Sequence, residues 1–135
     1  MRALIAALAL LALPGAVAAQ DRTKPTGEER LAKLLEGRVA AAPVSCINLR
    51  ALRSSEVIEG TAIVYSSGGS RVYVNRPRGS AADLRDDNIL VTRTNGSQLC
   101  NTDVVDLRDR FTMQPEGFVL LGDFVPYDRA PRPGS

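Results

Sequence analysis

The side chains best able to do chemistry in this 135-residue chain are carboxylates that cluster between positions 83 and 88. Asp83, Asp86, Asp87 and Asn88 could together present oxygen ligands to calcium. Their spacing departs from the alternating aspartates of an EF-hand loop, and Arg85 lies among them. A solvated turn therefore explains the cluster better than a metal site does. Asp86 and Asp87 are kept as candidates for a polar site.

Asp103, three residues after Cys100, is the third candidate. It could act as a ligand or as a catalytic carboxylate. The alternative is an aspartate that accepts backbone N–H bonds where a strand ends, as in an Asx turn. We favour this structural role and predict no catalytic residue. A carboxylate-dependent enzyme stays open as an alternative, because the chain has many acids and no pattern that selects two of them.

Other catalytic chemistries lack their residues. The chain has no histidine, which removes His-based triads, His metal ligands and the usual proton shuttle near neutral pH. Cys46 and Cys100 form no Cys-x-x-Cys motif, and a disulfide between them would leave no thiolate for zinc. The glycine-rich residues 67–70 open no predicted helix, so they do not match a phosphate-binding loop. The sequence thus predicts no metal and no cofactor.

The first 19 residues predict a cleavable signal peptide. Arg2 precedes an apolar run over residues 3–13, Pro14-Gly15 breaks it, and small residues follow, so that cleavage is expected after Ala18 or Ala19. The run is shorter than the roughly 20 apolar residues of a spanning helix. We therefore expect a periplasmic or secreted protein with no stable membrane insertion after cleavage.

In an oxidising compartment, the two cysteines predict one structural disulfide, Cys46–Cys100.

One short helix is expected before the strands, within a leader-and-helix segment at residues 20–43. Thr26 and Glu29 match a capping box, leucines follow at helical spacing, and Gly37 stands where a C-terminal cap would be. These signals predict an amphipathic helix over about residues 27–36.

Residues 44–128 read as strands and turns, followed by a tail at 129–135 that we expect to be disordered. A hairpin is predicted from residues 57–65 and 71–75, with Tyr65 opposite Arg71. One of its faces should be core, and the other, which carries Ile63 and Tyr65, should be half exposed. A second hairpin is predicted at Asn95-Gly96, with Val91 opposite Cys100 and a positive φ at Asn95. A last strand is expected at 118–125.

The expected fold class is α+β and mostly β: one short N-terminal helix, then an antiparallel β-rich domain, a small barrel or sandwich, with one disulfide.

Four short motifs occur in order along the chain. They are Cys46-Ile47-Asn48-Leu49-Arg50, Val72-Tyr73-Val74-Asn75-Arg76, Gln98-Leu99-Cys100-Asn101-Thr102-Asp103 and Leu121-Gly122-Asp123-Phe124-Val125-Pro126. Together they resemble an uncharacterised family of small secreted bacterial proteins with Cys-Ile-x-Leu-Arg and Leu-Cys-x-x-Asp motifs. Family members often carry a second cysteine pair, which this chain does not have. The resemblance implies a single extracytoplasmic domain and names no activity, ligand or partner.

The resulting hypothesis is a non-catalytic extracytoplasmic binding or accessory module, whose partner would be an envelope or extracellular protein. The alternatives are a small secreted inhibitor of an envelope hydrolase, which would insert loop 66–70 or 77–88, and the carboxylate-dependent enzyme. Nucleic acid is not expected as a partner, because the net charge is only +2 and charges of both signs are interleaved.

Overall fold

The computed structural model describes residues 23–134. The predicted signal peptide at 1–19 lies outside the described residues. Within them, no helix is long and apolar enough to cross a membrane.

Helix α1 (Gly27–Leu34) begins with the predicted capping box. The Glu29 N–H donates to Thr26 Oγ1 at 3.2 Å, and the Thr26 N–H donates to Glu29 Oε2 at 2.7 Å. The helix ends two residues earlier than expected, and the chain then turns through Gly37, whose φ of 70° favours glycine. Leu31 is buried under the strands, so the helix is held by packing as well as by its cap.

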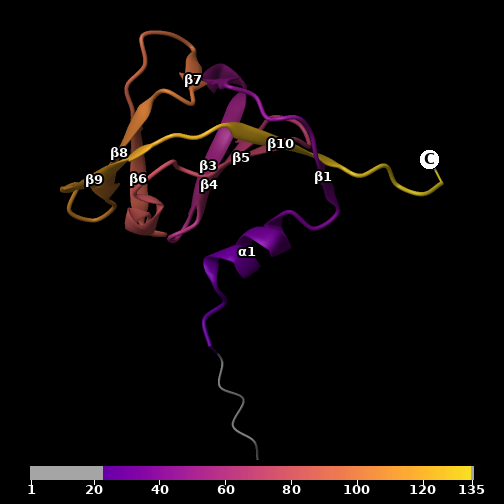
Figure 1. Ribbon diagram of the computed structural model, residues 1–135, viewed down its shortest axis with the longest axis horizontal. Coiled ribbons are helices and arrows are strands. Elements are labelled where there is room, and N and C mark those ends of the chain that lie inside the picture. The colour runs from indigo at the N-terminus through magenta and orange to yellow at the C-terminus, as the bar shows by residue number, and fades with distance from the viewer. Residues whose placement is uncertain (1–22, 135) are drawn as a thin grey trace, which may run out of the picture.

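A five-stranded antiparallel sheet forms the centre of the domain, in the order β1-β10-β5-β4-β3 (Figure 1). Its strands are β1 (Arg38–Ala40), β3 (Leu52–Ile58), β4 (Ala62–Ser67), β5 (Val72–Asn75) and β10 (Phe124–Arg129). Strand β10 thus includes Arg129, the first residue of the expected tail.

Two smaller antiparallel sheets complete the β structure. One has the order β6-β8-β9 and the other pairs β2 with β7. These strands are β2 (Cys46–Asn48), β6 (Asn88–Thr92), β7 (Gln98–Cys100), β8 (Val104–Asp109) and β9 (Pro115–Leu120). Two 3₁₀ turns join these strands to the central sheet: η1 (Leu49–Ala51) lies between β2 and β3, and η2 (Ala81–Asp83) lies between β5 and β6, within the loop at 77–88.

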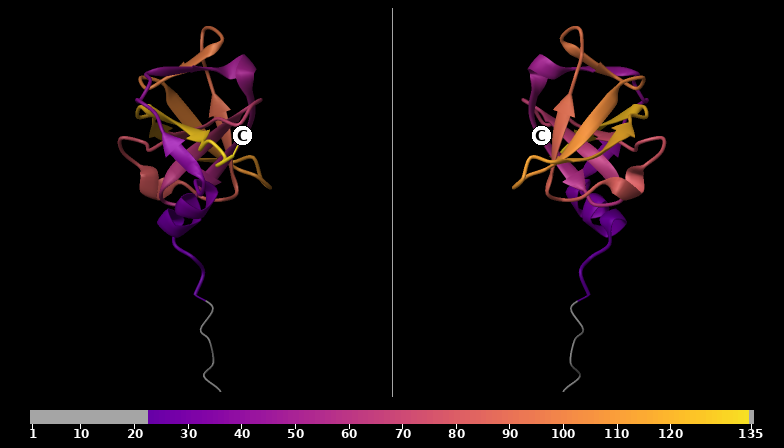
Figure 2. Two further views of the ribbon diagram at one scale, coloured as in Figure 1. Left: turned by 90° about the vertical axis from the view of Figure 1, so that its right-hand side faces the viewer. Right: turned by 90° about the vertical axis from the view of Figure 1, so that its left-hand side faces the viewer.

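Both faces of the central sheet carry buried apolar side chains, so the sheet separates two buried clusters. The smaller cluster joins α1 to the sheet, and both side views in Figure 2 show α1 at one end of the strands. The larger cluster lies between the central sheet and the two smaller ones, and is built from Ile47, Val57, Ile63, Tyr65, Leu84, Leu99, Val105, Leu107, Val119, Leu121 and Phe124. The expected fold class, mostly β with one short N-terminal helix and antiparallel strands, is confirmed.

A backbone hydrogen bond joins the loop after β5 to the β6-β8-β9 sheet. The Arg78 N–H donates to the Leu120 carbonyl at the end of β9, at 2.9 Å. Strand β3 is the last strand at one edge of the central sheet, and β6 is the last strand at one edge of the three-stranded sheet. The seam between β3 and β6 is not closed by strand pairing among residues 23–134.

The first predicted hairpin forms, but with a register shifted by two residues: Tyr65 lies opposite Tyr73, not Arg71. An even shift keeps each side chain on its face. The expected core face is therefore confirmed, with Ala62, Val64, Val72 and Val74 in the smaller cluster. The other face was expected to be half exposed. On it Arg71 is exposed and Tyr73 is half-buried, whereas Ile63 and Tyr65 are buried because the smaller sheets cover them.

The second predicted hairpin does not exist. Strand β6 pairs with β8, so Val91 lies opposite Asp106, whereas Cys100 lies opposite Cys46. Asn95 has no positive φ, and the expected primed turn is absent there. The long-range burial of the β6, β7 and β8 leucines outweighs the local turn preference of Asn-Gly.

Two expected strands are each split by a turn. Residues 57–65 are divided by a turn through Gly60, whose φ is 64°, into the end of β3 and the start of β4. Residues 118–125 are divided at Leu121-Gly122-Asp123 into the end of β9 and the start of β10. In both cases one apolar run serves two strands of the same domain.

Candidate functional site

Asp86 is engaged by basic side chains and by the backbone. Arg30 Nη1 donates to both of its carboxylate oxygens, at 2.6 and 2.7 Å, and the Glu59 N–H donates to Oδ1 at 3.1 Å. Lys24 Nζ lies 3.6 Å from Oδ2. Partial burial alone would raise the pKa of Asp86, but these hydrogen bonds and charges lower it below its usual value. The carboxylate therefore stays ionised and ties α1 to the β3–β4 turn.

Asp103 has the structural role that the sequence favoured. Its Oδ2 accepts the Cys100 N–H at 2.7 Å, and so caps the end of β7. Asp87 is half-buried in the turn before β6, and its side chain makes no hydrogen bond or ion pair among the described residues. Asp86 and Asp103 line different hollows, so the structure does not unite the candidates in one site. No group of three or more potential metal ligands occurs between residues 23 and 134.

The disulfide is confirmed and explains two of the motifs. Cys46 and Cys100 lie directly opposite each other in the β2–β7 pair, with Cα atoms 4.0 Å apart. The Cys-Ile-x-Leu-Arg and Leu-Cys-x-x-Asp segments are thus joined by a covalent bond, by a ladder and by the Asp103 cap. These motif residues build the fold and bring no free chemical group together.

The other two motifs meet at Asn75, which is fully buried. Its Nδ2 donates to the Gly122 carbonyl at 2.7 Å, and its Oδ1 accepts the Gly122 N–H at 3.0 Å. The side chain thus takes the place of a paired strand where β10 begins. A Cβ at Gly122 would overlap the Arg76 carbonyl oxygen, so this close approach requires glycine.

The seam between β3 and β6 is hollowed. Two adjoining hollows of about 320 and 250 Å³ share Ser55 and Leu90 as lining residues. Their walls together include all six residues from Leu52 to Val57 of β3, and Asn88, Ile89, Leu90 and Thr92 of β6. We call this feature the seam groove.

The seam groove is bounded by strand edges. Because successive side chains point to opposite faces, a strand that presents a face lines a hollow with alternate residues. Six consecutive residues of β3 line the seam groove, as do three of β6, so both strands turn their edges toward it. An edge strand presents backbone N–H and C=O groups that can pair with another strand. A register irregularity at Leu52/Ser54 leaves Arg53 without a partner in β4, a bulge of the kind found at sheet edges.

Tyr65 gives the seam groove one buried polar group. It lines the smaller hollow, is 4% exposed, and packs edge-on against Phe124 with ring centroids 5.9 Å apart. Its hydroxyl is buried and has no hydrogen-bond partner among the described residues. Burial raises the pKa of this phenol well above its usual value, so it stays a hydrogen-bond donor. A buried donor without an acceptor is unfavourable by about 1–3 kcal/mol.

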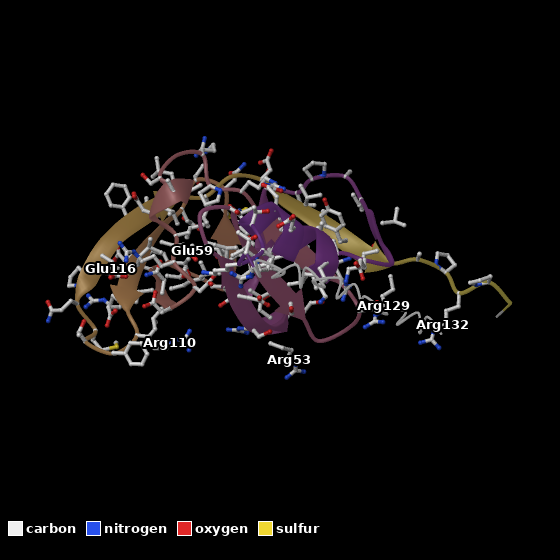
Figure 3. The ribbon with its side chains drawn as sticks, turned by 90° about the horizontal axis from the view of Figure 1, so that it is seen from below. Arg53, Glu59, Arg110, Glu116, Arg129 and Arg132 are labelled. Carbon is white, nitrogen blue, oxygen red and sulfur yellow. A yellow bond between two sulfur atoms is a disulfide. The ribbon has the colours of Figure 1, made fainter. Side chains whose placement is uncertain are left out.

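The unpaired charge at the seam groove is positive. Its two acids already face cations: Asp86 binds Arg30, and Glu56 lies 3.8 Å from Arg30 Nη2. Arg53 and Arg110 also line it, and neither forms an ion pair within residues 23–134. Figure 3 shows both guanidinium groups projecting from the same side of the molecule.

A third hollow, of about 450 Å³, lies over the loop after β6 and includes Asp103. That carboxylate is already bonded to the backbone, and no buried unpartnered polar side chain lies there. The seam groove is therefore the stronger candidate site.

Sequence reasoning named Asp86 and Asn88, which line the larger hollow of the groove, but missed the other residues of this site, including Arg53, Tyr65 and Arg110. One signal was available: residues 52–56 read Leu-Arg-Ser-Ser-Glu, polar on both faces of a strand, a pattern typical of a sheet edge.

Comparison with protein-family models, with curated proteins and with solved structures finds no match for this chain.

Proposed function

We propose that this protein is a non-catalytic, extracytoplasmic binding module whose ligand occupies the seam groove between β3 and β6. The observation that carries the proposal is the unpartnered Tyr65 hydroxyl, buried at a groove whose walls are two strand edges. A ligand that supplies a hydrogen-bond acceptor there would remove an unfavourable feature of the free protein. The extracytoplasmic location rests on the sequence of the first 19 residues.

The absence of catalysis is supported by the roles of the acids. Asp86 and Asp103, two of the three candidate carboxylates, accept strong hydrogen bonds within the domain. A general acid or base needs a carboxyl whose pKa is near the working pH, whereas the pKa of Asp86 is lowered. The enzyme alternative predicts that alanine at Asp86, Asp87 or Asp103 abolishes a hydrolase activity found in a substrate panel.

Photo-crosslinking in the native host tests the location of the binding site. A p-benzoylphenylalanine at Ser54, in the seam groove, should give a crosslinked adduct detectable by mass spectrometry. The matched control is the same residue at Val39, which is 58% exposed on β1, at the opposite edge of the central sheet. Equal adducts at both positions, or none at Ser54, would overturn the proposal. A single stoichiometric hydrolase as the adduct would favour the inhibitor alternative.

A further inference from the structure

Taking the proposed function as given, we infer that the seam groove binds an extended acidic peptide segment, which pairs with the edge of β3 as an added strand. The first ground is the geometry of the walls. Side chains alone would recognise a small molecule, but six consecutive β3 residues line the groove, so its wall is a backbone edge. The complementary ligand for such an edge is another extended backbone.

The length of the groove sets the size of the segment. Leu52 to Val57 spans five residue steps, about 17 Å at the rise of a β-strand. An extended peptide of about six residues covers that distance. The fold supports this occupant, because β3 and β6 are edge strands of their sheets and do not pair with each other among the described residues.

Charge selects an acidic segment over a basic or neutral one. Arg53 lies by the smaller hollow and Arg110 by the larger one, so unpaired positive charge is present in both parts of the groove. The acids of the groove do not cancel it, since Arg30 and Lys24 already face them. Carboxylates on the ligand would find guanidinium partners at both ends.

The floor of the groove selects an alternating pattern. Leu49, Leu52, Leu90 and Tyr65 line the smaller hollow, and the Tyr65 hydroxyl is buried. Every second side chain of an added strand would face this floor, and the others would face solvent and the arginines. The ligand should therefore alternate apolar and acidic residues, with one ligand oxygen accepting the Tyr65 O–H.

The test is a fluorescence-anisotropy titration of the exported, purified protein with labelled, acetylated (Val-Glu)₄. Saturable binding is expected, with (Val-Lys)₄ at least tenfold weaker. An acidic peptide N-methylated at alternate residues, which cannot donate along one edge, should also bind at least tenfold more weakly. No saturation by (Val-Glu)₄ at 1 mM, or equal affinity for the three peptides, would overturn the inference.

Two variants and a control locate the contact. Arg53→Glu/Arg110→Glu should weaken (Val-Glu)₄ binding at least tenfold, whereas Arg129→Glu/Arg132→Glu, with the same charge change toward the C-terminal end (Figure 3), should not. Tyr65→Phe should weaken binding about threefold to tenfold, the range expected for one hydrogen bond. An unchanged affinity in both groove variants, with circular dichroism showing that they fold, would also overturn the inference.

The outcomes separate this inference from the proposed function. A Ser54 crosslink to a non-peptide adduct, together with no peptide binding, would leave the groove as the site and reject the acidic strand. Edge-to-edge dimerisation would give a crosslink to a second copy of this chain and a dimer in sedimentation that Arg53→Glu/Arg110→Glu does not weaken. These two results together would also reject the acidic strand.

Discussion

Replacing Asn75 by aspartate changes a single donor into an acceptor at the place where β5 meets the start of β10. Asn75 is fully buried, donates to the Gly122 carbonyl and accepts the Gly122 N–H. An ionised carboxylate can keep only the second of these bonds, and it would face the carbonyl oxygen with a buried charge. A protonated carboxyl can keep both bonds, so Asn75→Asp should fold with the new group neutral.

The expected loss of stability follows from the proton that the folded state must hold. In the unfolded chain an aspartate has a pKa of about 3.9, and each unit corresponds to about 1.4 kcal/mol. Keeping the group protonated at pH 7 therefore lowers the free energy of unfolding by about 4 kcal/mol, and by only about 0.5 kcal/mol at pH 4. The folded-state pKa is raised, so the variant is most stable below the unfolded pKa and loses stability as pH rises.

Urea unfolding of the parent and of Asn75→Asp at pH 4, 5.5 and 7 measures this difference. The matched control is Asn95→Asp, at an exposed asparagine whose side chain makes no hydrogen bond among the described residues. The difference between parent and variant should grow from under 1 to about 4 kcal/mol between pH 4 and pH 7, and the control should stay near the parent. A loss below 1 kcal/mol at pH 7, or an equal loss at both ends of the range, would refute the reasoning.

Three further predictions concern the framework. Loss of the Cys46–Cys100 bond should lower the free energy of unfolding by about 4 kcal/mol on the chain-entropy account, and a Cys46→Ala/Cys100→Ala variant as stable as the parent in urea would contradict it. Gly122→Ala should destabilise the domain by about 2 kcal/mol or more because of overlap with backbone, whereas Gly69→Ala, with open space around it, should leave the urea midpoint almost unchanged. Similar midpoints for the two variants would count against that packing. Asp86→Asn should destabilise more at pH 7 than at pH 2.5, because a lowered pKa makes the contribution of Asp86 present above about 3.8 and lost as pH falls. Thermal unfolding at both pH values checks this, and a loss independent of pH would disagree.

Features set by neighbouring residues were predictable from the sequence. The capping box at Thr26 and Glu29 fixed the start of α1, because both of its bonds form within one turn. The alternation of Val72 and Val74 predicted a core face. This prediction holds although the predicted register is wrong, because a shift by two residues keeps each side chain on its face. The disulfide followed from the cysteine count rather than from geometry.

Features set by distant residues were not predictable. Asn95-Gly96 favours a local hairpin, but Leu90 and Leu107 reach the larger cluster by pairing β6 with β8, and Leu99 reaches it opposite Ile47. Burial of these leucines is worth more than one turn preference. The seam groove was missed for the same reason, since Arg53, Tyr65 and Arg110 come from three separate segments that only the closed fold brings together.

Amide hydrogen exchange of the full chain, followed by NMR with and without (Val-Glu)₄, tests the central claim most directly. An added strand should slow exchange at alternate amides of Leu52–Ile58, where β3 turns its edge to the groove, and should leave β1 at the other edge of the same sheet unchanged. Protection confined to β1 or β9, or no change in β3 at saturating peptide, would contradict the assignment of the seam groove as the binding site.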